Sequence, residues 1–119
     1  MAMRDRIVLE KIINFCERIK NNLERNQDNF DAFKNDYMFQ DACCMFIVQI
    51  GELASLLSEE TKQKSPHIPW RAIKDTRNFY VHNYGAIDLD VVWATMHEDI
   101  PTLLEQSRML LRGIENTAG

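Results

Sequence analysis

Residues 77 to 84 bring together more chemically versatile side chains than any other short stretch of this chain. The segment reads Arg-Asn-Phe-Tyr-Val-His-Asn-Tyr, so Arg77 precedes His82 by five positions and Tyr84 by seven. It supplies a permanent cation, an imidazole that titrates near neutral pH and a phenol. These are the groups that cleavage of a phosphodiester bond without a metal ion requires.

The residues around this segment predict a helix from Trp70 to about His82, with Pro69 in its first turn and Gly85 beyond its end. Helical spacing aligns four polar residues on one face, namely Arg71, Asp75, Asn78 and His82. The opposite face carries Trp70, Ile73 and Tyr80 and should turn toward the core. Asn78 lies one turn before His82 and can orient its imidazole, while Arg77 reaches the same region from the flank.

The remaining periodicity predicts an all-α protein, an up-and-down four-helix bundle that forms one domain over residues 1–119. A first helix from about Arg4 to Glu24 carries an apolar stripe of Ile7, Ile12, Phe15, Ile19 and Leu23. Residues 26–29 are a polar break, and a second long helix runs from Asn35 or Asp36 to about Ser58. Asp88 caps a final helical segment, which Pro101 kinks or restarts.

The composition is typical of a globular protein rather than a disordered one, with 45% hydrophobic and 27% charged residues. Its three cysteines, two of them adjacent, lack the spacing of a zinc site or a disulfide framework. We therefore expect buried thiols, a cytoplasmic location, no metal and no cofactor. The most apolar stretch, residues 42–57, contains Gln49 and Glu52 and is too short to cross a bilayer.

The charge distribution is uneven although the net charge is −4. Residues 61–87 contain five basic residues, including Arg71, Lys74 and Arg77, and a single acidic residue, Asp75. A basic patch on an acidic protein can bind a phosphodiester backbone. The alternative is an ordinary fluctuation of surface charge.

The motif also carries a resemblance to a known family. Arg77, His82 and Tyr84, spaced as Arg, four residues, His, one residue, Tyr, resemble the signature of the HepT-like toxins of the HEPN superfamily. The flanking pieces are similar as well: Ile68-Pro69-Trp70-Arg71, Ile50-Gly51-Glu52, Asp88 to Trp93, and Asp99-Ile100-Pro101. The resemblance covers the chain from about Asp36 to about Gln106.

The resemblance implies the toxin of a type VII toxin–antitoxin pair: a metal-independent endoribonuclease, active as a homodimer whose two copies of Arg77 and His82 face one cleft. His82 would serve as acid or base, with Asn78 in support, and Arg71 and Lys74 would bind RNA. The resemblance further implies that an MntA-type nucleotidyltransferase antitoxin adenylylates Tyr84, placing bulk and negative charge where RNA must dock.

Other interpretations of the same residues stay open. The chain can be a non-catalytic nucleotide- or substrate-binding subunit of a nucleotidyltransferase, or a structural interaction protein. Glu52 either contacts Arg71 or Arg77 or lies at an exposed edge. We expect His67 and His97 to be solvated surface residues and the six methionines to serve as packing.

Overall fold

The computed structural model describes residues 2–75 and 88–118. Arg77, Asn78, His82 and Tyr84 lie outside the described residues. The predicted helix that contains them can be followed only through its start, where residues 70–75 are helical.

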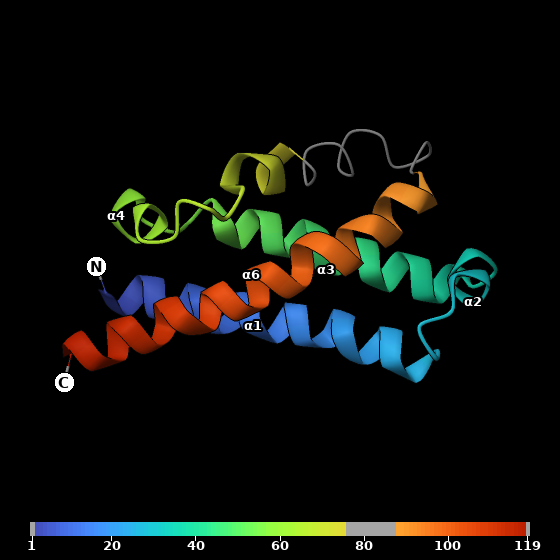
Figure 1. The fold of residues 1–119 in the computed structure, drawn as a ribbon, viewed down its shortest axis with the longest axis horizontal. Coiled ribbons are helices and arrows are strands. Elements are labelled where there is room, and N and C mark those ends of the chain that lie inside the picture. Colours follow the sequence, from blue (N-terminus) through green and yellow to red (C-terminus); the bar gives the residue numbers. More distant parts are fainter. Residues whose placement is uncertain (1, 76–87, 119) are drawn as a thin grey trace.

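The described chain is made of helices and contains no strand, which confirms the all-α prediction. Three helices are long: α1 (Ala2–Arg25), α3 (Tyr37–Ala54) and α6 (Leu89–Ala118). Two are short: α2 (Phe30–Lys34) and α4 (Glu59–Gln63). Helix α1 packs against both α3 and α6 and runs opposite to them, so both chain ends lie at one end of the molecule (Figure 1).

The core follows the helical periodicity of the three long helices. Ile12, Ile19 and Leu23 of the predicted stripe on α1 are buried, and Phe15 packs at its edge. Ile7 is an exception, because it is 45% exposed while Asp5 is buried. The buried face of α1 is therefore rotated slightly from the predicted stripe, and it turns Asp5 toward α4.

The predicted second helix is α3, which ends earlier than expected and is followed by a separate short helix, α4. Asp36 is the N-cap of α3, as expected, and its carboxylate accepts hydrogen bonds from the backbone N–H groups of Met38 and Phe39. The helix ends at Ala54, however, four residues before the predicted end. Ser58 then caps α4 by accepting a hydrogen bond from the Thr61 N–H. Ser58 followed by Glu59 and Glu60 is a common helix start, and it competes with continuation of α3.

Helix α2, which we did not predict, closes one end of the bundle. Its Phe33 is fully buried and meets Phe39 edge-on, with ring centroids 5.0 Å apart. Trp93 of α6 lies 5.4 Å from the same ring. The turn before α2 holds two consecutive residues at positive φ, Gln27 at 55° and Asp28 at 52°.

Helix α6 is continuous over 30 residues and includes Pro101 within its length. Asp88 caps it as predicted, its carboxylate accepting from the Asp90 N–H. Pro101 was predicted to kink or restart the helix; the helix does not restart there, and Pro101 is exposed. Burial of Ile100, Leu103 and Leu104 in the core offsets the missing hydrogen bond.

The cysteines and the methionines differ in burial. Cys16, Cys43 and Cys44 are free and buried, which confirms the prediction of buried thiols. The methionines do not all serve as packing: Met96 is buried, but four are at least half exposed, namely Met3, Met38, Met45 and Met109. None of the helices in the described ranges is long and apolar enough to span a bilayer.

Candidate functional site

A buried carboxylate in the first turn of α1 fixes the position of α4. Asp5 is 1% exposed, and its carboxylate accepts hydrogen bonds from the Ser58 N–H at 3.1 Å and the Ser58 hydroxyl at 2.6 Å. The Thr61 hydroxyl donates a third, at 2.5 Å. Burial alone raises the pKa of such a carboxyl, but these hydrogen bonds outweigh it and hold the Asp5 pKa below its ordinary value.

Trp70 in turn is fixed to α4 and the turn that follows it. Its indole N–H points at two carbonyl oxygens, those of Lys62 and Ser65, each 3.2 Å away. Ile68 beside it is buried, and the Pro69 carbonyl accepts the first helical hydrogen bond from the Ile73 N–H. Asp5 thus holds α4, and α4 with the turn after it holds Trp70. These contacts fix the position at which the helix over residues 70–75 begins.

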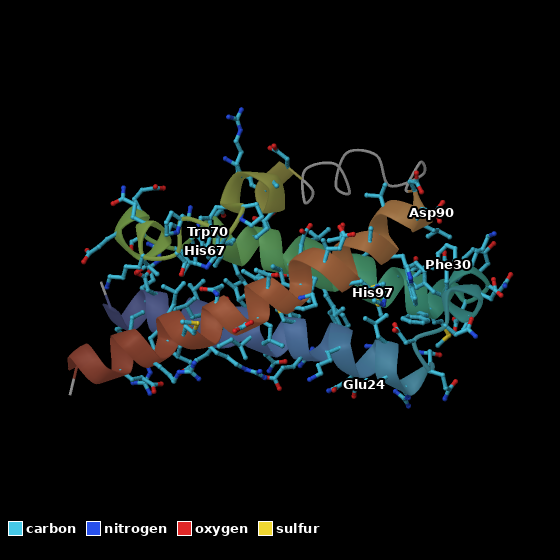
Figure 2. All side chains as sticks on the ribbon, viewed as in Figure 1. Glu24, Phe30, His67, Trp70, Asp90 and His97 are labelled. Atoms are coloured by element: carbon cyan, nitrogen blue, oxygen red, sulfur yellow. The ribbon has the colours of Figure 1, made fainter. Side chains whose placement is uncertain are left out.

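A groove of about 810 Å³ lies between α4, the end of α3 and residues 70–75. Figure 2 shows Trp70 beside α4, at the start of the segment that leads to the motif. Three cationic side chains line the groove, those of Lys62, Arg71 and Lys74, together with the carboxylates of Glu59 and Asp75. The partly exposed ring of Trp70 also lines it. The cations outnumber the carboxylates, so the groove favours an anionic ligand.

The three cations differ in their surroundings. Lys62 is the most enclosed, with 19% of its side chain exposed, and its Nζ lies 3.7 Å from Oε1 of the well-exposed Glu59. Arg71 and Lys74 are exposed. Since a surface pair at this distance is weak, Glu59 leaves most of the Lys62 charge available to a ligand in the groove.

The structure therefore brings Arg71 and Lys74, the two predicted RNA-binding residues, together in one groove with Lys62 and Trp70. Lys62 was counted in the basic stretch of residues 61–87, but it was not predicted to bind RNA, because α4 was not recognised as a separate helix. Trp70 was predicted to face the core; it packs against the core as expected, but it is only half buried and also lines the groove. The acidic first turn of α4 after Ser58 is the signal that would have revealed Lys62 on this wall of the groove.

Glu52, His67 and His97 do not line this groove. Glu52 and His67 are exposed. His97 is more than a solvated residue, because its Nε2 lies 2.6 Å from the Asp28 carboxylate and its Nδ1 lies 2.8 Å from the Trp93 carbonyl. Among the residues described, no group of His, Cys, Asp or Glu side chains is arranged to hold a metal ion.

Comparison with known families gives a match over most of the chain. The family described as "Ribonuclease HepT-like" matches residues 8–110, a range that includes the groove and the motif from Arg77 to Tyr84. No solved structure matches the chain with significance.

Three relatives illustrate the similarity. "Probable ribonuclease HepT" of Thermococcus cleftensis is 35% identical over 74 residues, covering 62% of this chain and 67% of its own. Two others carry the name "Putative RNase". One, from Methanocaldococcus jannaschii, is 26% identical over 89% of this chain and 96% of its own. The other, from Caldanaerobacter subterraneus, is 29% identical over 87% of this chain and 91% of its own.

Proposed function

Because this chain belongs to the HepT-like ribonuclease family and is an endoribonuclease, we propose that it cuts RNA with Arg77 and His82. The observation that carries the proposal is the match over residues 8–110, inside which Arg77, His82 and Tyr84 keep the spacing of the motif. Asn78 supports His82, and Arg71 and Lys74 bind backbone phosphates near the site.

The chemistry is an in-line transfer at phosphorus that uses side chains alone. A base removes the proton of the ribose 2′-hydroxyl, and the 2′-oxygen attacks the adjacent phosphate. The bond to the 5′-oxygen of the next nucleotide breaks, and an acid protonates that leaving oxygen. Arg77 stabilises the negative charge that develops on the non-bridging oxygens. The products are a 2′,3′-cyclic phosphate and a free 5′-hydroxyl.

The reaction needs one base and one acid, whereas the motif holds a single histidine. A twofold homodimer supplies both, because two copies of Arg77 and His82 then face one cleft. The proposal therefore includes a homodimer as the active species.

The test is cleavage of RNA by the wild type and by two single variants, Arg77→Ala and His82→Ala. Both variants should lose cleavage by a factor of about 10² or more. Cleavage by the wild type should persist in EDTA, and its products should carry cyclic phosphate ends. A folded His82→Ala protein that cuts RNA at the wild-type rate would contradict the proposal and favour a non-catalytic binding subunit.

Tyr84 is the residue through which we propose that the nuclease is controlled. We propose that a cognate MntA-type nucleotidyltransferase adds AMP to its phenol oxygen, within a toxin–antitoxin pair, and that the added bulk and charge exclude RNA. Intact-mass and peptide mass spectrometry after incubation with the partner, ATP and Mg²⁺ should find AMP on Tyr84. Tyr84→Phe should receive none. Inhibition without any adduct would mean that the partner acts by binding alone.

A further inference from the structure

The groove beside α4 has features that cleavage chemistry alone does not require. Its cations come from two separate elements, Lys62 from α4 and Arg71 and Lys74 from the helix that leads toward the motif. Residues 70–75 directly precede the segment that contains Arg77 and His82 in the chain. A ligand bound in the groove therefore lies next to that helix, on the side of its first turns.

Trp70 gives the groove an aromatic surface of fixed orientation. The polar edge of its indole is already satisfied by the carbonyls of Lys62 and Ser65, at 3.2 Å each. What remains for a ligand is ring surface, which attracts another flat ring rather than a hydrogen-bonding group. The same two contacts hold the ring in place, so a stacking partner does not have to order it.

A basic groove with an aromatic surface is the combination that binds single-stranded nucleic acid. The cations neutralise successive phosphates, while the ring stacks on a base without reading its identity. A small anion such as free phosphate would engage the cations but would leave Trp70 unused. A double helix would hide its base faces from the ring.

We propose that the groove between α4 and residues 70–75 holds the single-stranded RNA that flanks the scissile bond, with Lys62, Arg71 and Lys74 on phosphates and Trp70 stacked on a base. This inference rests on the proposed function and specifies its substrate. The enzyme would require unpaired RNA that extends several nucleotides beyond the cut, and would accept different base sequences in that extension.

The first experiment measures the effect of the groove cations on cleavage. Lys62→Gln and Arg71→Gln are compared with Lys64→Gln, a matched control at the C-cap of α4 that does not line the groove. For a 20-nucleotide single-stranded RNA, the groove variants should raise KM about fivefold, more than they lower kcat. Each should also reduce the dependence of log KM on log salt by about 0.7, the value for one single-strand phosphate contact.

Dependence on RNA length separates the groove from the cleavage centre. The loss caused by Lys62→Gln or Arg71→Gln should be larger for the 20-nucleotide RNA than for the shortest RNA that the wild type cuts. Equal losses on both lengths, or losses no greater than that of Lys64→Gln, would overturn the inference.

The second experiment observes Trp70 directly. The chain has two tryptophans, so Trp93→Phe leaves Trp70 as the single indole fluorophore and keeps a ring in the aromatic cluster at α2. A 2′-O-methyl RNA of 20 nucleotides lacks the attacking hydroxyl and binds without being cut. Stacking should quench the Trp70 emission, and a duplex of the same length should quench it much less.

The two proposals fail in different ways. If the wild type cuts RNA but Trp70 emission does not change and the groove variants behave like Lys64→Gln, the flanking site is wrong and the nuclease assignment stands. If 2′-O-methyl RNA quenches Trp70 and Lys62→Gln weakens that binding, while the wild type cuts no RNA, the groove stands and the catalytic proposal fails. Equal quenching by single-stranded RNA and inorganic phosphate would overturn the RNA groove in favour of a small-anion site.

Discussion

Asp5 shows how one polar side chain can determine the position of a whole element. A buried carboxylate is unfavourable unless each of its oxygens is hydrogen-bonded, and here the donors come from residues more than fifty positions away in the chain, Ser58 and Thr61. Periodicity placed Ile7 in the core, yet the structure buries Asp5. The difference arises because the Asp5 carboxylate accepts hydrogen bonds from the start of α4, and these compensate for its removal from water.

Asp5→Ala should destabilise the protein by about 2–4 kcal/mol, because it leaves the Ser58 N–H and the buried Thr61 hydroxyl without their acceptor. Thermal unfolding followed by circular dichroism measures the effect. Glu10→Ala is the matched control on α1, since Glu10 forms an exposed pair with Arg6 and should contribute about 0.5 kcal/mol or less. A loss from Asp5→Ala no larger than this control would contradict the structural role.

The pH dependence of the same residue has a definite sign. The pKa of Asp5 is lowered in the folded state from its ordinary value of 3.8. Its contribution is therefore fully present above that value and is lost as the pH falls through the lower, folded-state pKa. The difference in stability between wild type and Asp5→Ala should shrink when unfolding is measured below about pH 4.

At the scale of elements, the sequence predicted the long helices well and the short ones poorly. Helix α1 and the start of α3 agree with prediction because apolar spacing and the Asp36 cap act locally. Helices α2 and α4 were missed because each has five residues, too few for periodicity to register. Their positions depend on distant partners, Trp93 for α2 and Asp5 for α4.

His97 links two elements that sequence alone could not connect. Both of its ring nitrogens face acceptors, the Asp28 carboxylate and the Trp93 carbonyl, so the doubly protonated imidazolium satisfies both. Partial burial by itself lowers the His97 pKa, but these two hydrogen bonds and the Asp28 charge outweigh it and raise the pKa above 6.5. The contact ties α6 to the turn between α1 and α2.

Asp28→Asn should weaken this tie at low pH and have less effect at high pH. A raised His97 pKa means that the stability is fully present below about pH 6.5 and is lost as the pH rises through the folded-state value. Since a third of the imidazole is exposed, the effect should stay below about 1 kcal/mol. Asparagine tolerates the positive φ at residue 28.

Urea unfolding of wild type and Asp28→Asn between pH 5 and pH 9 measures the difference. His97→Phe is a useful second variant. The ring centroids of Trp93 and His97 lie 4.4 Å apart, so phenylalanine keeps a ring against Trp93, but it cannot carry a charge. A stability difference between wild type and Asp28→Asn that grows with pH would show that His97 is not the charged partner.

At the scale of the whole molecule, the sequence indicated the family and the motif more readily than their surroundings. Arg77, His82 and Tyr84 were recognised by type and spacing alone, because a short linear motif needs no three-dimensional information. The groove was only half foreseen, since Lys62 joins Arg71 and Lys74 through the folding of α4. A concentration of basic residues in the sequence predicts a basic patch, but not which helices line the groove.

The proposed homodimer makes a quantitative prediction for mixed subunits. Each chain has a mass of 14.0 kDa, and light scattering should report twice that value. If one cleft needs a histidine from each subunit, activity after mixing and reassembly with His82→Ala should fall as the square of the wild-type fraction. A linear decrease would mean that each subunit works independently, and a species of 14.0 kDa at micromolar concentration would argue against the dimer.

The burial of the three cysteines has a practical consequence for experiments on folding. Burial raises the pKa of Cys16 and Cys43 to about 12 and, together with the charge of Asp41, that of Cys44 to about 11. Near neutral pH these thiols are protonated and shielded, so a thiol reagent must wait for the protein to open. Their labelling rates report separately on opening of α1, through Cys16, and of α3, without any engineered probe.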